Sequence, residues 1–424
     1  MRRLLLLAPL VLTACVSGPI THAKKDAAVI PLAHIKANLA FTCAHERFPE
    51  ASAQSDVLFK YARWLEKNNQ LKRDKGVDAE IERLYRIAAE NGHAKANINL
   101  QNGSMRGRRY QLTGEENLRL SQRLIDEGVA TGYYFVGIFL NQGSAGLKED
   151  KEMALRYFRK AADEGSANAQ EFVANKLAPI DIAPDIARQM RTCAAEQGQG
   201  KAALALGVDL SEDRHYQEAL QAFQLGVAAG DETSAGFLEA GFGGPEPDNW
   251  LHYLGQQEDQ ERAARYKQIW RILANYSYAS PKVPEINEIV PLPPAKLPSW
   301  DGKLQWLEER LANVAPPKPS EVQIQQLAKA RGLNPATGKP LPDSLVFDWS
   351  TFPLRTAYTD SLCPQSGYWK VMWTVHQEWR ETTRYFEEGE LMPAETVRTV
   401  RQRLWPLPDK VDEYLGRVAW GMIG

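Results

Sequence analysis

A glycine recurs at nearly regular intervals through the first half of this chain, and this period constrains the fold more than any other sequence feature. The glycines are separated by 36, 37, 33 and 32 residues, and they are Gly92, Gly128, Gly165, Gly198 and Gly230. Four residues after each of them stands a small residue, in order Ala96, Gly132, Ala169, Ala202 and Ser234. Such a period is typical of stacked helical hairpins, each packing on its neighbours. The sequence therefore predicts a mainly α protein, an α-solenoid over residues 51–276.

The clearest single unit lies at residues 154–165. Its apolar residues, including Phe158 and Ala162, repeat at helical spacing, so one stripe of the helix is expected to face a neighbour. Asp150 is suited to cap the start of this helix, and Gly165 is suited to end it in the left-handed conformation. The unit is therefore predicted to be one half of a helical hairpin.

These segments carry a resemblance to a known family. Residues 86–92, 158–165 and 193–198 resemble the second helix of Sel1 repeats, and residues 146–150 resemble the turn between the helices of that family. The resemblance covers about half of the chain and is specific for the fold. It implies a scaffold that binds other proteins, and by itself it does not identify the partner.

The N-terminus has the pattern of a bacterial lipoprotein signal. Two arginines precede an apolar run at residues 4–12, which is too short for a membrane-spanning helix of about 20 residues. Residues 12–15 end in Cys15, the position that such signals leave lipid-modified. We expect residues 1–15 to be this signal, in preference to an ordinary secretory signal with an incidental cysteine. No acidic residue follows at 16–18, so a periplasmic location at the outer membrane is expected, with lipid as the only anchor.

The remaining cysteines leave their pairing open. With Cys15 assigned to lipid, Cys43, Cys193 and Cys363 remain in an oxidising compartment, which permits one disulfide plus a thiol, or no disulfide. Residues 16–50 are expected to be a tether leading into the solenoid. Within them, residues 41–46 bring cysteine, histidine and glutamate together but lack a second histidine one helical turn on. We therefore expect a capping or core role there and no metal.

Two groups of side chains are candidates for partner binding. Those of the repeats are Tyr85, Tyr133, Tyr134, Tyr157 and Tyr216, and those of the C-terminal region are Trp369, Trp373, Trp379 and Arg380. Tryptophan and arginine dominate the energetics of protein interfaces. Packing between helices or within a core is the competing interpretation for both groups, because aromatic residues at regular spacing usually face a core.

The composition changes after the last repeat. Twelve prolines lie between Pro281 and Pro342, and proline cannot continue a helical stack because it lacks a backbone donor. We expect a connector at 277–340 that docks on the solenoid through Trp300, Trp306 and Leu307 and contains short helices, and a free linker is the alternative. Residues 341–424 are predicted to form a small module with some β structure. There Trp369, Val371, Trp373 and Val375 alternate with Lys370, Met372, Thr374 and His376, the pattern of a half-buried strand.

The familiar motifs of enzymes are missing from the sequence. There is no G-x-S-x-G, no P-loop and no H-E-x-x-H. Three H-x-K tripeptides occur, but a phospholipase D site also needs an aspartate five residues after each lysine, where Val29, Phe41 and Leu100 stand. The net charge of -2 gives no electrostatic signature for nucleic acid. The sequence thus predicts a protein that is not an enzyme and uses no cofactor, nucleic acid or small-molecule substrate.

The mature chain as a whole is similar to a group of Sel1-repeat lipoproteins that share the proline-rich connector, here at residues 289–298. Residues 363–369 and 389–393 resemble a short module of proteins associated with type VI secretion. Members of the group in pseudomonads resemble immunity proteins encoded beside type VI phospholipase D effectors. The resemblance therefore implies a periplasmic antitoxin that neutralises a lipase by covering it. The alternative is an envelope scaffold that organises other proteins without any toxin.

Overall fold

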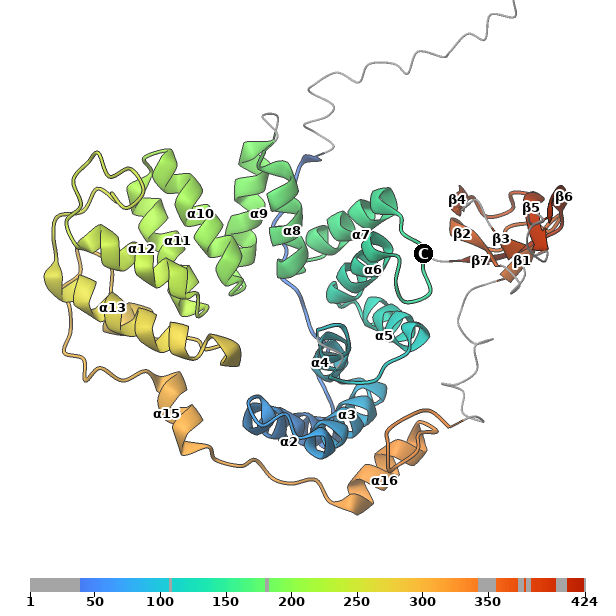
Figure 1. The fold of residues 1–424 in the computed structure, drawn as a ribbon, viewed down its shortest axis with the longest axis horizontal. Helices are drawn as coiled ribbons and strands as arrows, with labels where there is room; N and C mark the ends of the chain where they lie inside the picture. Colours follow the sequence, from blue (N-terminus) through green and yellow to red (C-terminus); the bar gives the residue numbers. More distant parts are fainter. Residues whose placement is uncertain are drawn as a thin grey trace, which may run out of the picture. The chain divides into compact units, whose positions relative to one another are not determined.

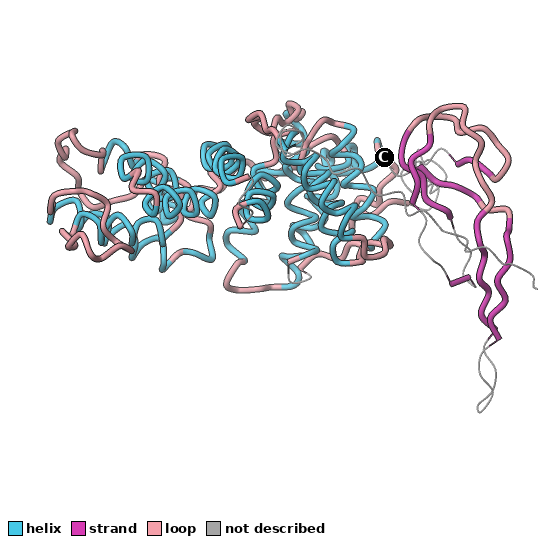
Figure 2. Tube along the Cα trace, turned by 90° about the horizontal axis from the view of Figure 1, so that it is seen from above, coloured by secondary structure: helices cyan, strands magenta, loops and turns pink. Residues whose placement is uncertain are grey.

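The computed structural model describes residues 39–106, 109–179, 183–341, 356–372, 377–378, 383–401 and 410–422. All the elements named below lie in one compact unit, residues 41–424. Helices fill most of its described part and the strands lie near the C-terminus (Figure 2), so the predicted mainly α fold with a small β module is confirmed. The predicted signal and Cys15 lie outside the described residues.

Consecutive helices of the repeats pack side by side to form the solenoid (Figure 1). Their bounds are α2 Ala53–Asn69, α3 Lys75–Glu90, α4 Ala94–Met105, α5 Gly114–Asp126, α6 Thr131–Gln142, α7 Lys151–Asp163, α8 Ala167–Leu177, α9 Pro184–Glu196, α10 Gly200–Glu212, α11 Tyr216–Ala228, α12 Glu232–Phe242 and α13 Gln260–Asn275. Among the described residues, none of the helices has the length and apolar character needed to cross a bilayer.

The periodic glycines end helices in the left-handed conformation, as their spacing predicted. All five have a positive φ, between 73° and 107°, which a residue with a side chain adopts only at a cost. The small residues that follow are buried at helix contacts. A side chain at Gly132 would place its Cβ 2.6 Å from the carbonyl oxygen of Ser121 on the preceding helix. The two small positions of each unit therefore set the turn and the close approach of successive helices.

Helix caps reinforce these boundaries. The predicted cap is present, since the Asp150 side chain accepts a hydrogen bond from the Met153 amide at 2.9 Å. At α4 the cap is a buried histidine: Nδ1 of His93 accepts from the Ala96 amide at 3.1 Å, and its ring lies against Phe59. Burial lowers the pKa of His93, and the nearby Asp56 carboxylate opposes that effect only in part. His93 is therefore built into the fold as a neutral cap.

This cap predicts a pH dependence. Because the pKa of His93 is lower in the folded than in the unfolded chain, the unfolded chain binds its proton first as pH falls through about 6.5. The free energy of unfolding should therefore decrease from pH 7 toward pH 5, by about 1.4 kcal/mol for each unit of pKa difference. H93N keeps an acceptor at the cap and removes the titration. Denaturant unfolding at several pH values should show a flatter dependence for H93N, and an unchanged slope would contradict this role.

The proline-rich connector is docked. Its helices are η1 Ser277–Ala279, α14 Ile286–Ile289, α15 Gln305–Ala312 and α16 Glu321–Ala330. The first part of the connector shares a core with α10–α13, to which it contributes Val283, Ile286 and Leu304. Its last part shares a core with α2 and α3, through Ile324 and Leu327 of α16. The connector thereby joins the last helical hairpins to the first (Figure 1).

Polar contacts hold the connector at the same places. Arg83 of α3 pairs with Glu321 at 2.7 Å and donates to the carbonyl of Pro335 at 2.6 Å. The Arg310 guanidinium of α15 lies 5.9 Å from the ring centre of Tyr276, the C-cap of α13, and 5.6 and 5.5 Å from those of Tyr278 and Trp306 within the connector. Cation–π contacts of this kind stabilise by about 0.5–1 kcal/mol each where exposed. The interpretation of this region as a free linker is therefore excluded.

The C-terminal module consists of short antiparallel strands. They are β1 Thr356–Tyr358, β2 Gly367–Met372, β3 Gln377–Glu378, β4 Thr383–Phe386, β5 Glu395–Arg401, β6 Lys410–Gly416 and β7 Ala419–Met422. One sheet has the order β1-β7-β2-β4 and the other β3-β5-β6. Val371 pairs with Trp420, and both are buried with Trp369, which accounts for the alternation in the sequence. The predicted strand continued to residue 375, and residues 373–376 lie outside the described part.

Candidate functional site

An extended segment crosses the helical hairpins and ties several of them together. We call residues 41–48 the strap (Figure 1, blue). Its contacts reach from α9, through Cys43, to α4, where the Lys95 ammonium lies 5.3 Å from the centre of the Phe48 ring. Between these ends it accepts hydrogen bonds from Thr131 of α6 and Gln170 of α8. A segment with no secondary structure of its own thus fixes helices of several repeats relative to one another.

A disulfide attaches one end of the strap. Cys43 is bonded to Cys193 of α9, with their Cα atoms 5.6 Å apart, and Cys363 is a free, buried thiol. Of the alternatives that the sequence left open, the structure has one disulfide plus one thiol. The bond closes a loop with a sequence separation of 150 residues. It therefore connects the segment before the first repeat to the fourth of the five periodic units.

Glu46 of the strap caps α6. The residue before α6, Ala130, provides no side-chain cap, and the Glu46 carboxylate instead accepts hydrogen bonds from the amide and the hydroxyl of Thr131. Burial raises the pKa of Glu46 above its ordinary value, while the two hydrogen bonds from Thr131 act in the opposite direction. The capping role expected for residues 41–46 is thus filled by this carboxylate.

Two glutamine side chains hold the backbone of the strap. Gln170 of α8, which is fully buried, donates to the carbonyl of Ala44 at 2.9 Å. Gln197, just after α9, donates to the Gln170 side chain and accepts from the Glu46 amide, both at 2.9 Å. These hydrogen bonds do not involve sulfur. They position the strap independently of the disulfide.

One of the periodic glycines lies directly under the strap. A Cβ at Gly165 would stand 2.6 Å from the carbonyl carbon of His45 and 2.7 Å from the Glu46 nitrogen, whereas a Cβ at Gly128 would meet nothing within 4 Å. Both glycines have a positive φ. The pair therefore separates the cost of the backbone conformation from the cost of displacing the strap.

Replacing these two glycines with alanine should give unequal losses of stability. G128A should cost about 1–2 kcal/mol, the ordinary cost of a left-handed residue. G165A should cost about 3 kcal/mol, because the strap must also move. G165A should in addition speed the reduction of the Cys43–Cys193 disulfide by a dithiol. Denaturant unfolding and thiol counting measure the two effects, and equal losses with equal reduction rates would show that the strap does not rest on Gly165.

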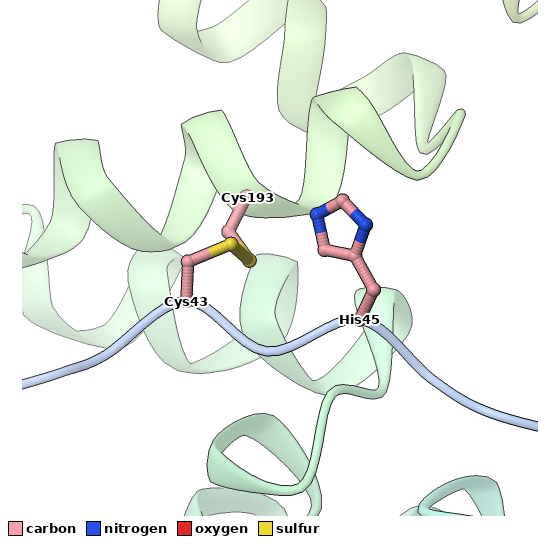
Figure 3. A group of neighbouring side chains, drawn as sticks. All are labelled: Cys43, His45 and Cys193. Carbon is pink, nitrogen blue, oxygen red and sulfur yellow. A yellow bond between two sulfur atoms is a disulfide. The ribbon is translucent and has the colours of Figure 1, made fainter.

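The junction of the strap with α9 gathers metal-type ligands. Figure 3 shows Cys43 and His45 projecting from the same side of the strap toward α9. Among the described residues, these two and Cys193 form the one group of at least three such side chains whose ligand atoms all lie within 4.8 Å of one another. Glu196 follows Cys193 by about one helical turn, and its carboxylate lies 3.5 Å from Nε2 of His45. The sulfur atoms of this group are joined in the disulfide.

The aromatic candidates of the repeats divide by exposure. Tyr85 is fully buried, and its hydroxyl donates to Glu66 at 2.9 Å; burial raises its pKa. Its side chain faces the core between α2, α3 and α4, so it is not available to a partner. Tyr134, half-buried, packs on Phe158, and Tyr216 packs edge-on against Tyr253. The core interpretation therefore applies to Tyr85.

Tyr133 and Tyr157 are the two candidates that lie together on the surface. Their ring centres are 6.2 Å apart, on α6 and α7, and both side chains are half-buried. The Lys160 ammonium lies 5.8 Å from the centre of the Tyr133 ring. Aromatic rings beside a cation are common at protein interfaces. We call these three residues the α6–α7 patch.

The candidates of the C-terminal module are only partly described. Trp369 is fully buried, and its indole nitrogen donates to the carbonyl of Gln365 at 3.2 Å, so it is a core residue and not an exposed anchor. Trp373, Trp379 and Arg380 lie outside the described residues. Sequence reasoning did not single out Glu196, Gln170 or Gln197, since nothing near them in the sequence indicates that the strap lies over them.

The fold and these contacts define a class of protein, an α-solenoid of helical hairpins whose units are tied by a strap and a docked connector. A family model described as "Domain of unknown function (DUF6396)" matches residues 234–341, which span α12, α13 and the connector. No curated protein matches the chain.

Several solved structures are similar to the chain. One is "Pseudomonas aeruginosa 5086 (PA5086)", with 26% identity and a TM-score of 0.46 over 60% of this chain and 95% of that one. Another is the "immunity protein Pa5087 from Pseudomonas aeruginosa", with 24% identity and a TM-score of 0.47 over 60% and 95%. A third is a "Sel1 repeat protein from Oxalobacter formigenes", with 18% identity and a TM-score of 0.37 over 49% and 86%. Two of these three structures are thus described as an immunity protein and as a Sel1 repeat protein.

Proposed function

We propose that this chain is a periplasmic immunity protein, anchored through Cys15, that neutralises a type VI lipase effector of the phospholipase D class by covering it. The single observation that carries the proposal is that the helical hairpins are tied together by the strap, the disulfide and the docked connector. Such a scaffold presents a preformed surface. Binding to it avoids the cost of ordering the contact residues, which otherwise weakens association.

An inhibitor that acts by covering its target needs only a suitable binding surface. A stable interface buries about 1,600 Å² and needs a few well-placed anchors, and it needs no catalytic group. The α6–α7 patch, Tyr133, Tyr157 and Lys160, supplies a candidate anchor on the described surface. The sequence resemblance to immunity lipoproteins supplies the class of partner. A lipid at Cys15 would keep the inhibitor in the compartment that the toxin enters.

A competition experiment tests the proposal. The gene for this chain is deleted together with the neighbouring effector gene, and the strain is challenged with its effector-proficient parent. We expect the deletion strain to be killed and the full-length chain, supplied from a plasmid, to restore survival. Survival of the deletion strain without the chain would contradict an immunity role and would favour the scaffold alternative.

Variants of the chain test whether protection depends on the lipid at Cys15 and whether effector binding depends on the α6–α7 patch. C15A, which cannot be lipidated, should protect less at equal expression. Y133A/Y157A should weaken binding to the effector encoded by the neighbouring gene by at least tenfold in calorimetry, about 1.4 kcal/mol. W250A, which removes an exposed aromatic side chain outside the patch, is the control and should bind as the parent does. Equal binding by the double variant and the parent would place the contact elsewhere on the chain.

A further inference from the structure

The strap junction holds the elements of a second binding site. Its ligand-type side chains come from two segments, Cys43 and His45 from the strap and Cys193 and Glu196 from the end of α9. Residues two apart on an extended segment point to the same side, and residues three apart on a helix do so as well. Cys43, His45 and Cys193 therefore face one another across the junction (Figure 3), and the Glu196 carboxylate lies beside His45 at its edge.

We propose that reduction of the Cys43–Cys193 disulfide converts this junction into a zinc site. A dithiol transfers two electrons and two protons to the disulfide and becomes a disulfide itself, leaving two cysteine thiols in the chain. A zinc ion then binds both sulfurs as thiolates and releases two protons. The His45 imidazole and the Glu196 carboxylate complete four ligands.

The donor set and its spacing fit zinc. Thiolate with imidazole and carboxylate is a combination that zinc binds in tetrahedral sites, with bonds of about 2.0–2.3 Å. Two nitrogen or oxygen ligands of such a site stand about 3.4 Å apart, and His45 Nε2 and Glu196 Oε2 are 3.5 Å apart already. Two thiolates on one zinc stand about 3.8 Å apart, a separation that side-chain rotation allows between Cα atoms 5.6 Å apart.

The site stays assembled without the disulfide. Gln170 holds the carbonyl of Ala44, Gln197 holds the amide of Glu46, and Thr131 holds the Glu46 carboxylate. These contacts flank Cys43 and His45 on the strap, so both remain opposite α9 after reduction. Preorganisation of this kind is what a metal site requires of the surrounding structure.

The site is also open to solvent. The side chains of His45 and Glu196 are 52% and 49% exposed, and Cys43 is exposed while Cys193 is buried. A reductant and a metal ion can therefore reach the junction from one side. Zinc in the reduced chain would link the strap to α9, as the disulfide does in the oxidised chain.

Equilibrium dialysis against zinc chloride tests this proposal. The full chain carrying C15S is prepared oxidised and after reduction with a phosphine, and bound zinc is measured by mass spectrometry. We expect about one zinc per reduced chain and none retained by the oxidised chain. H45A and E196Q should each weaken zinc binding by about 10–100-fold. C363S, which alters a cysteine outside the junction, should bind as the parent does.

The thiols give a second measurement, which tests directly whether the two sulfur atoms are zinc ligands. Zinc should slow the reaction of the two junction thiols with a disulfide reagent, and C43S, whose altered side chain is exposed, should lose both effects while keeping its helical circular dichroism. Absence of zinc from the reduced chain, equal binding by the oxidised chain, or full binding by C43S or H45A would overturn the proposal.

Discussion

Replacing Arg86 with methionine should lower the free energy of unfolding by about 3–5 kcal/mol. The guanidinium is 3% exposed and lies between two carboxylates, those of Glu82 on its own helix and Glu116 on α5. It also donates to the carbonyl of Gln111 at 2.7 Å. Methionine fills similar space but carries no donor, so two largely buried carboxylates would lose their cation and keep only the backbone amides of Gln111 and Thr113 as donors. The cost arises from these unpaired charges more than from the loss of the ion pairs themselves.

Two further variants separate that cause from a loss of packing. R86M/E82Q/E116Q carries neither the cation nor the two anions and should recover much of the stability. K60M breaks the exposed pair of Lys60 with Asp56 on α2 and should change the free energy of unfolding by no more than about 1 kcal/mol. Denaturant unfolding followed by helical circular dichroism measures all three. If R86M lost no more stability than K60M, the buried network would not be holding α3 to α5.

The repeats could be predicted because the information for them is local. Gly165 ends its helix because the next turn needs a left-handed residue, and the sequence shows that residue in place. Asp150 is similarly visible as a cap a few residues before an apolar stripe. The connector was predicted to dock because its aromatic residues are costly to leave in water. In each case the deciding interaction lies within a few turns, or follows from the residue type alone.

The strap could not be predicted, because its partners are distant in the sequence. Glu46 caps a helix 85 residues away, and its amide bonds to a side chain 151 residues away. An extended segment has no periodicity that would indicate its neighbours, and three cysteines permit several pairings. The burial of Tyr85 shows a related limit. A helical stripe identifies a face, but only the packing of the other helices decides whether that face is inward.

Removing the disulfide with C43S should lower the free energy of unfolding by about 3–5 kcal/mol. The bond closes a loop with a sequence separation of 150 residues, and the chain-entropy relation gives about 5 kcal/mol for a loop of that size. The strap also stops restraining α9, although its hydrogen bonds to Gln170 and Gln197 remain. Position 43 is exposed, so serine there adds little cost of its own. The measurement is denaturant unfolding of the helical signal, with a chelator present so that no metal replaces the bond.

Reduction provides the matched control for that variant. The reduced parent chain should unfold at the same denaturant concentration as C43S, and a reductant should leave C43S unchanged. Reduction lowers the free energy of unfolding chiefly because the unfolded chain gains freedom. The reduced parent should therefore be less stable than the oxidised parent, but it should keep the same helical content in the absence of denaturant. A reduced parent as stable as the oxidised one would mean that the glutamine contacts and the Glu46 cap alone fix the strap, and that the disulfide adds no restraint to the solenoid.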